Sequence, residues 1–334
     1  MMDDSKEYIL VTGATGFIGS HLCERLLVEK YNLIGIDNFD PFYDKDIKIR
    51  NLEQIRAKAQ APDQFEFLEL SITNQTDIFK NLESKKIKMI IHLAAKAGVR
   101  PSIQDPLGYA EANILGTQNM LEFCKVRKVG YFVFGSSSSV YGNNKKLPFS
   151  EEDRVDKPIS PYAATKRAGE LLCHTYADLF GIKMVVLRFF TVYGARQRPD
   201  LAIHKFTDLI RKGKPIQMYG DGTSQRDYTY IDDIIDGIMG SLKWIENPEN
   251  QNKYEIFNLG ESDTVDLKKL ISLIEKNLNK DAIIEKAPWQ AGDVDVTYAD
   301  ITKAKEFLGY SPQMKIEKGI PRFVEWFLDS QKKS

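Results

Sequence analysis

The chain has 334 residues, which is enough for one large domain or for two, each with a sizeable hydrophobic core. Its 46 basic and 47 acidic residues nearly cancel, so the composition gives no sign of nucleic acid or an anionic membrane as a partner. The three cysteines lack metal-ligand spacing, no apolar run approaches the ~20 residues of a membrane span, and the N-terminus lacks the apolar core of a signal peptide. We therefore expect a cytoplasmic protein with reduced thiols and no metal site.

The first predicted elements are a buried strand at residues 8–11 and a glycine-rich loop with Gly13, Gly16 and Gly19, followed by a helical pattern. Glycines at this spacing allow a tight turn and let a pyrophosphate approach the backbone where a helix begins. A second strand ends on Asp37, whose carboxylate suits a ribose 2′-hydroxyl and repels a 2′-phosphate. The segment therefore predicts a dinucleotide site that prefers NAD to NADP, and an ordinary turn followed by a surface acid is the structural alternative.

Strand and helix signals continue to alternate through the first half of the chain. Further apolar strands are predicted at residues 65–68, 89–93, 131–134 and 184–187, and helices at 112–124 and 162–180. This alternation is typical of an α/β fold with a doubly wound parallel (Rossmann) sheet. Because ligands gather at the carboxyl ends of parallel strands, four segments are expected to meet in one crevice: the glycine loop, residues 94–98, the serine run 136–139 and residues 189–191.

Tyr162 and Lys166 form a Tyr-x-x-x-Lys pattern at the start of the second of these helices. Four residues apart on a helix, a phenol and an ammonium project from the same face. A phenol ionises near pH ~10, and a neighbouring lysine favours the phenolate, which makes Tyr162 a candidate base at neutral pH. A hydroxyl of the serine run, at Ser137, could share the travelling proton. These residues together suit the oxidation of an alcohol.

The second half of the chain is less regular, with turn-rich stretches and helices predicted at 233–244, 267–278 and 320–328. We expect a smaller, mostly helical substrate-binding cap that is interleaved with the sheet domain. In this division, residues 1–188 with about 230–260 form the NAD-binding Rossmann domain, and about 189–229 with 261–334 form the cap.

The ordered motifs of the chain resemble a known family. They are Gly13-x-x-Gly16-x-x-Gly19, Asp37-Asn38, His92-Leu93-Ala94-Ala95, Asn113, Val140-Tyr141-Gly142, Tyr162-x-x-x-Lys166, and residues 188–194 and 220–228. Along essentially its whole length the chain resembles an extended short-chain dehydrogenase/reductase, specifically a nucleotide-sugar epimerase. The resemblance implies a tightly held NAD, a UDP-sugar substrate, a homodimer that associates through the helices around 108–124 and 162–180, and a product used for polysaccharide synthesis.

Within that superfamily the serine run decides between reactions. Dehydratases carry an Asp-Glu pair there and decarboxylases a Glu just before the valine, whereas this chain has Ser137, Ser138 and Ser139. Residues 97–102 and 194–202 resemble UDP-glucuronate 4-epimerases, in which hydroxyls matching Ser138, Ser139 and Thr191 grip the sugar carboxylate. Short hydroxyls donate to a carboxylate without adding a competing charge. The implied reaction is NAD-dependent 4-epimerisation of UDP-glucuronate to UDP-galacturonate through a transient 4-keto intermediate.

The alternatives are a 4-epimerase of neutral UDP-hexoses, a UDP-glucuronate decarboxylase, and a non-catalytic nucleotide-sensing protein on the same fold. Single residues have alternatives as well. The serine run could be a polar strand end that caps a loop, and Arg198 a solvated surface guanidinium. Tyr109, Met120 and Leu171 could face a partner subunit or lie in the core. Ser71 stands where the family often has an Asp that bonds the adenine, and Arg226 is expected to carry much of the diphosphate binding.

The expected site residues fall into three groups. The catalytic residues are Tyr162, Lys166 and Ser137. The cofactor-binding residues are Gly13, Gly16, Phe17, Ile18, Gly19, Asp37, Asn38, Ser71, Ile72, Ala94, Ala95, Lys96, Asn113, Ser136, Tyr162, Lys166 and Phe189. The substrate-binding residues are Val99, Arg100, Ser138, Ser139, Thr191, Arg198, Arg226 and Asp293.

Overall fold

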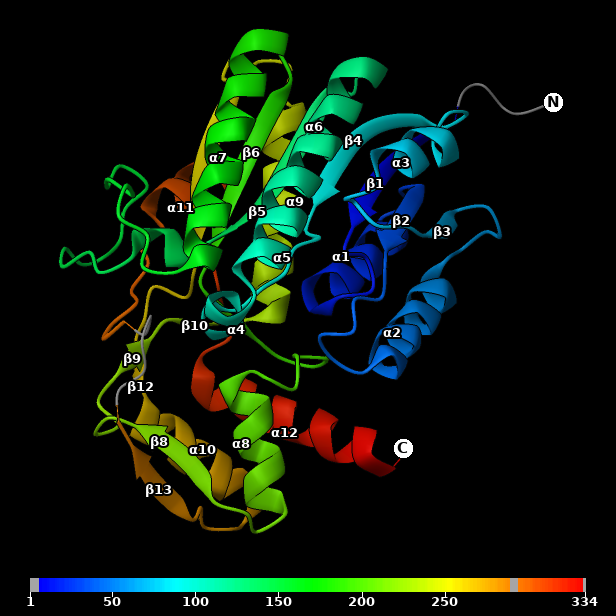
Figure 1. The fold of residues 1–334 in the computed structure, drawn as a ribbon. Helices are drawn as coiled ribbons and strands as arrows, with labels where there is room; N and C mark the ends of the chain where they lie inside the picture. Colours follow the sequence, from blue (N-terminus) through cyan, green and yellow to red (C-terminus); the bar gives the residue numbers. More distant parts are fainter. Residues whose placement is uncertain (1–5, 289–293, 333–334) are drawn as a thin grey trace.

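The structure, a computed structural model, describes residues 6–288 and 294–332. Its centre is a seven-stranded parallel sheet in the order β11-β6-β5-β4-β1-β2-β3 (Figure 1). The strands are β1 (Glu7–Thr12), β2 (Leu33–Asp37), β3 (Phe65–Glu69), β4 (Lys86–His92), β5 (Tyr131–Ser137), β6 (Lys183–Phe189) and β11 (Tyr254–Leu259). The predicted α/β fold with a doubly wound parallel sheet is confirmed.

Two hydrophobic cores lie on opposite faces of this sheet. Successive residues of a strand point to opposite faces, so Leu10 of β1 belongs to one core and Val11 to the other. One face is covered by α1 (Phe17–Val28), α2 (Lys45–Lys58) and α9 (Ile231–Glu246). The other is covered by α3 (Gln75–Asn81), α6 (Gly116–Arg127) and α7 (Pro161–Phe180). Burial on both faces explains why the strands are continuously apolar rather than alternating.

The remaining elements gather at the carboxyl edge of the sheet and below it (Figure 1). Short parallel pairs join β7 (Thr191–Tyr193) to β10 (Tyr228–Tyr230) and β8 (Ile216–Tyr219) to β13 (Ile284–Ala287), and β9 (Gln225–Arg226) pairs antiparallel with β12 (Val265–Asp266). The helices here are α8 (Ala202–Arg211), α10 (Leu267–Leu278) and α12 (Ile316–Lys332), while α11 (Thr302–Leu308) packs against β11 and α9. The chain therefore leaves the sheet after β6, returns through α9 and β11, and leaves again.

The helix predicted at residues 112–124 is longer and less regular than expected. It starts as α5 (Pro106–Ala110), passes through a π-helical turn at Glu111–Leu115 and continues as α6; a short α4 (Val99–Gln104) precedes it. A π turn inside a helix is energetically unfavourable and occurs mainly at functional sites. Here it contains Asn113, which faces the segment after β4.

Candidate active site

A cleft of about 730 Å³ lies between the carboxyl edge of the sheet and the smaller layer beneath it. This volume is toward the large end of the range of small-molecule sites. Segments that follow six strands of the sheet, β1 to β6, line it, together with residues of the cap. The four segments expected to meet in one crevice do meet here, because a parallel sheet brings all carboxyl ends of its strands to one edge.

The glycine loop approaches the neighbouring backbone too closely for any side chain. Gly13 has φ +70°, and a Cβ on it would lie 2.8 Å from the backbone nitrogen of Ala94. A Cβ on Gly19 would lie 2.1 Å from the carbonyl oxygen of Gly13. No side chain of the described residues caps the N-terminus of α1 at Gly16, so the first backbone N–H groups of this helix remain to bind an anion. The cradle fits the pyrophosphate of a dinucleotide.

Asp37 ends β2 at the wall of the cleft, where its side chain is nearly buried. Its carboxylate accepts hydrogen bonds from the backbone N–H of Thr15 at 3.2 Å and of Phe39 at 2.9 Å, which hold it in one orientation. Asn38 lines the cleft beside it. A fixed carboxylate next to the pyrophosphate cradle fits an adenosine ribose that carries a free 2′-hydroxyl.

Two other predicted cofactor residues have hydrogen bonds within the protein. The Ser71 hydroxyl bonds the hydroxyl of Thr73 at 2.8 Å, although Ser71 and Ile72 both line the cleft. Asn113 is buried behind the cleft: its Oδ1 accepts the backbone N–H of Lys96 at 2.8 Å, and its Nδ2 donates to the Lys96 carbonyl at 2.9 Å. The side chain of Asn113 thus fixes the segment Ala94–Lys96, which itself forms the cleft wall.

Tyr162 lies in the first turn of α7, directly after the helix start. Ser160 caps this helix by accepting the N–H of Ala163 at 3.1 Å, and Pro161 occupies the first position, where its missing N–H costs nothing. The positive end of the helix dipole therefore lies beside the phenol and favours its ionised form. Burial raises the pKa of Tyr162, whereas a hydrogen bond with Ser137 and the charge of Arg198 lower it.

Lys166 follows one turn later and is buried. Its Nζ donates to the carbonyl oxygen of Gly135 in β5 at 2.7 Å. Burial lowers the pKa of Lys166 to about 8. The neighbouring Cys173 and Glu170 have the opposite, smaller effect. From the sequence, Lys166 is expected to lower the pKa of Tyr162. In the structure the positive charge that lowers it is that of Arg198, and the Nζ of Lys166 donates to β5.

The serine run follows β5 into a 3₁₀ turn, Ser138–Tyr141. Ser136, Ser137, Ser138 and Ser139 all line the cleft. The hydroxyl of Ser136 donates to Glu170 at 2.6 Å, so it points toward α7. Ser137 Oγ accepts the N–H of Ser139 at 3.2 Å, and the Ser139 hydroxyl is buried without a hydrogen-bond partner among the described residues. A buried unpaired hydroxyl in a cleft wall is unfavourable unless a ligand bonds it.

Thr191, Arg198 and Arg226 also line the cleft, and Thr191 begins β7 just after β6. Arg198 is not a solvated surface residue: its guanidinium forms two bonds with the carboxylate of Asp200, at 2.9 and 2.8 Å, and its Nη2 donates to the Ala97 carbonyl at 3.4 Å. Arg226 Nη1 donates to the backbone carbonyls of Gln225 and Asp295, at 2.9 and 3.2 Å.

The structure does not bring every predicted substrate residue to the cleft wall. Val99 lines the cleft, but Arg100 is directed at the ring of Tyr219, with 4.3 Å between the guanidinium carbon and the ring centre. Asp293 lies outside the described residues. Phe189 and the glycine-loop residues Phe17 and Ile18 lie in the wall.

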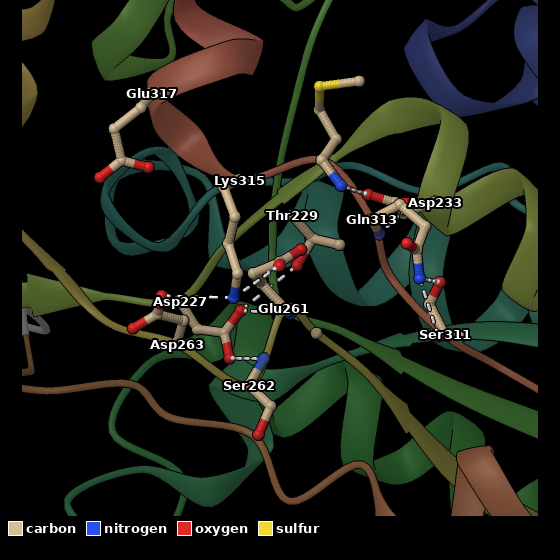
Figure 2. Close-up of polar contacts among 12 residues, drawn as sticks. Asp227, Thr229, Asp233, Glu261, Ser262, Asp263, Ser311, Gln313, Lys315 and Glu317 are labelled. Atoms are coloured by element: carbon tan, nitrogen blue, oxygen red, sulfur yellow. Dashed lines mark hydrogen bonds and ion pairs between the residues drawn. The ribbon is translucent and has the colours of Figure 1, made fainter.

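A buried carboxylate, Asp227, holds the cap side of the cleft together (Figure 2). It accepts the backbone N–H groups of Glu261 at 2.7 Å, Ser262 at 3.1 Å and Ala299 at 3.1 Å. The backbone carbonyl of Asp227 also accepts the N–H of Thr191 at 3.1 Å. Because Asp227 directly follows Arg226, these hydrogen bonds hold both Arg226 and Thr191 in place. Burial raises the pKa of Asp227 to about 7 against these hydrogen bonds.

Several lining residues were not identified from the sequence, among them Phe42, Tyr43, Tyr109 and Thr297. Tyr109 is the most informative, because its ring meets that of Tyr162 edge-on at 6.2 Å and its hydroxyl donates to the Ala97 carbonyl at 3.1 Å. The sequence indicated only that Tyr109 was core or interface. Its only available signal was its position four residues before Asn113, which places both on one side of the irregular helix.

Among residues 6–288 and 294–332, no cluster of His, Cys, Asp and Glu could hold a metal ion, and no helix is long and apolar enough to cross a membrane.

Comparison with known proteins shows the family of this chain. The model of the NAD dependent epimerase/dehydratase family matches residues 9–260. The chain belongs to this family. A UDP-glucuronate 4-epimerase of Thermodesulfobacterium geofontis is 42% identical over 320 residues, which are 96% of this chain and 95% of the relative.

Solved structures agree with this assignment. The UDP-glucuronic acid 4-epimerase of Bacillus cereus, in complex with UDP-glucuronic acid and NAD, is 38% identical with a TM-score of 0.87, covering 97% of this chain and 99% of that one. A UDP-glucose 4-epimerase of Thermotoga maritima with UDP-glucose is 31% identical, with a TM-score of 0.86 and the same coverage. This chain is an NAD-dependent nucleotide-sugar 4-epimerase, and the predicted family, activity and cofactor are confirmed. The epimerase therefore acts on a UDP-sugar.

Proposed function

We propose that this epimerase interconverts UDP-glucuronate and UDP-galacturonate. The observation that carries the proposal is the set of three hydroxyls, Ser138, Ser139 and Thr191, which line the cleft just after the neighbouring strands β5 and β6. The unpaired, buried hydroxyl of Ser139 supports a ligand group that accepts hydrogen bonds there. A sugar carboxylate accepts several such bonds, and hydroxyl donors hold it without a competing charge.

We assign the reaction chemistry to other residues that line the same cleft. NAD bound at the glycine loop supplies the acceptor and donor of the hydride of C4. We assign to Tyr162 the removal of the proton from the sugar 4-hydroxyl, and to Ser137 the orientation of that hydroxyl and the relay of its proton. Lys166 and Asp37 would hold the riboses of the cofactor. Turning of the planar 4-keto sugar between the two proton transfers inverts C4.

The serine run argues against the two neighbouring reactions of the family. Dehydratases and decarboxylases that resemble this chain carry a carboxylic acid at these positions, and residues 137–139 carry none. A neutral UDP-hexose remains the second candidate substrate, because the similar Thermotoga maritima structure is bound to UDP-glucose. A neutral hexose offers one hydroxyl oxygen where the carboxylate offers two charged ones, so a set of three hydroxyl donors favours the acidic substrate.

The same proposal covers the organisation of the chain. Residues 1–188 with about 230–260 would bind NAD, and about 189–229 with 261–334 would bind the nucleotide sugar, with Arg226 on the diphosphate. We propose a cytoplasmic homodimer that associates through α5, α6 and α7. Exposed apolar side chains on these helices support that surface, namely Leu107, Leu115, Val126, Leu171 and Leu179.

The deciding experiment is proton NMR of UDP-glucuronate incubated with the purified protein, without added NAD. Formation of UDP-galacturonate is expected, and it would establish substrate, reaction and retained cofactor together. A UDP-pentose as the main product would mean decarboxylation. No change, even with NAD supplied, would reject UDP-glucuronate and move the test to UDP-glucose.

A further inference from the structure

Arg196 has a backbone conformation that is unusual for its residue type. Its φ is +64°, in the left-handed region, where a Cβ crowds the backbone and glycine or asparagine is normally found. It lies in a tight turn in which the N–H of Gln197 donates to the carbonyl of Gly194 at 3.1 Å. An arginine in this position indicates that its side chain does something that glycine could not do.

That side chain pairs with a helix of the other layer. Arg196 donates to both carboxylate oxygens of Glu24 on α1, at 2.7 and 3.1 Å, and the two side chains are only 10% and 16% exposed. A planar, two-bonded pair of this kind fixes orientation as well as distance, and shielding from water strengthens it.

His21, one turn before Glu24, completes the junction. Its Nε2 bonds the carbonyl of Ala195 at 3.0 Å, and its Nδ1 faces Arg196 Nη2 at 3.4 Å. Burial and the charge of Arg196 lower the pKa of His21 to about 3, so the ring is neutral, with Nε2 donating and Nδ1 accepting. Helix α1 therefore binds the turn at two points, the backbone carbonyl of Ala195 and the side chain of Arg196.

The turn leads within two residues to Arg198. The Ala97 carbonyl accepts both Arg198 Nη2 at 3.4 Å and the hydroxyl of Tyr109 at 3.1 Å, and the ring of Tyr109 contacts Tyr162. Arg198 is thus linked to Tyr162 through Ala97 and Tyr109, and its charge lowers the pKa of Tyr162. Beyond the turn, His204 of α8 donates to the carbonyl of Gln197 at 2.7 Å, so the segment has little freedom to move separately from its anchors.

We propose that Glu24 and Arg196 are positioning residues, a clasp through which the cofactor-binding helix α1 sets Arg198 in the substrate site. The proposal rests on the proposed role of Arg198 in binding the nucleotide sugar. The proposal assigns a second function to α1. The N-terminus of this helix would bind the pyrophosphate of NAD, and its Glu24 would orient Arg198 for the nucleotide sugar.

The test compares steady-state kinetics of Arg196→Gly and Glu24→Gln with the parent enzyme. Glycine suits the left-handed turn, and glutamine keeps the shape of Glu24, so both variants should keep the parent melting temperature and NAD content. We expect KM for the UDP-sugar to rise roughly tenfold in each, with kcat within about threefold of the parent. A merely structural role would lower the active fraction, and hence kcat, without changing KM.

Two controls make the result specific. Glu29→Gln, at the residue that follows the end of the same helix, removes a carboxylate that pairs with Arg25 at 2.7 Å away from the turn, and should change nothing. In an Arg198→Met background, adding Arg196→Gly should change KM by less than about twofold, because the clasp acts through Arg198.

The proposed clasp would be overturned if KM were unchanged in both single variants. It would also be overturned if Arg196→Gly raised KM as much in the Arg198→Met background as in the parent. An inactive parent on UDP-glucuronate would instead reject the proposed substrate. The comparison would then be made with UDP-glucose, on which the same rise in KM is expected.

Discussion

Tyr162 shows how one side chain is prepared for proton transfer by its surroundings. Burial works against the phenolate, while the start of α7, the Ser137 hydroxyl and the Arg198 guanidinium work for it. The balance in the ligand-free protein leaves the pKa of Tyr162 raised. A cationic nicotinamide ring bound nearby would add a further positive charge, so we assign full activation of the base to the loaded enzyme.

Replacing Tyr162 by Phe should remove the base and leave the pocket shape unchanged. We expect turnover to fall by about 10³-fold or more, with NAD still bound and the melting temperature unchanged. The measurement is the rate of epimerisation by NMR, together with the NAD content of the purified variant. Tyr176→Phe, further along the same helix, where the hydroxyl bonds Glu122 of α6, is the matched control and should keep parent activity. Substantial activity in Tyr162→Phe would refute the assignment.

Thr191 is expected to control the side reaction of the proposed substrate. A 4-keto glucuronate is a β-keto acid, which loses CO₂ when its carboxylate bond stands perpendicular to the carbonyl plane, and a held carboxylate avoids that alignment. Thr191→Ala should therefore increase the fraction of UDP-pentose among the products several-fold. The product ratio is measured by NMR, with Thr175→Ala on the exposed side of α7 as control. An unchanged ratio would remove Thr191 from this role.

Among the elements, the short strands β7, β9 and β10 depend on one buried group. Strands of two or three residues have little stability of their own. The Asp227 carboxylate stabilises this region by accepting backbone N–H groups from the loop after β11 and from Ala299. Figure 2 shows the loop residue Ser262 beside it. A second carboxylate, Asp233 at the start of α9, similarly accepts the N–H groups of Gln313 and Met314, at 2.9 and 3.0 Å. Both carboxylates anchor loops far away in sequence.

Asp227 should make stability depend on pH. Its pKa in the folded protein is about 7, above its ordinary value of 3.8, so between these two values the folded state binds more protons than the unfolded state. Its stabilising contribution is complete below about pH 4 and is lost as the pH rises to about 7. The free energy of unfolding of the parent should therefore fall relative to that of Asp227→Asn across this range.

Thermal and urea unfolding at several pH values measure this difference. Asp263→Asn, which removes an exposed carboxylate in the same region, is the matched control for the loss of one charge. A pH-independent difference for Asp227→Asn would mean that the buried carboxylate ionises normally in the folded protein.

In the assembled protein, the face formed by α5, α6 and α7 is the candidate for subunit contact. Leu107 and Leu179 are 83% and 65% exposed, and α6 and α7 lie side by side over one face of the sheet (Figure 1). Of the three residues left open by the sequence, Tyr109 and Met120 are buried within the subunit and Leu171 is 53% exposed. An apolar face of this kind normally packs against a partner.

Leu171→Glu should shift the protein from dimer to monomer, because dimerisation would bury an unpaired charge. Size-exclusion chromatography with light scattering measures the mass. Ile283→Glu, which places the same charge on a similarly exposed residue of the cap, should leave the mass unchanged. A monomeric parent, or a Leu171→Glu variant that remains dimeric, would contradict the proposed interface.

Local patterns were sufficient to predict the sheet, the cofactor loop and the position of the base. Gly16 and Gly19 are required by contacts within one strand-loop-helix unit, Gly13 by its positive φ in the same loop, and Tyr162 and Lys166 by the pitch of one helix. Burial of both faces made the strands uniformly apolar, so their positions were visible in the composition of short segments. Such features depend on neighbours a few residues away, and one sequence contains that information.

Contacts between distant segments had no such local signal. The pairing of Glu24 with Arg196 joins residues 172 positions apart, and Asp227 binds backbone groups as far as 72 positions away. The charge that lowers the pKa of Tyr162 comes from Arg198 rather than from the lysine four residues along the helix. A charged residue has the same appearance in a sequence whether it is solvated or paired. Its partner, its burial and therefore its pKa depend on how the layers pack, which is settled only when the chain folds.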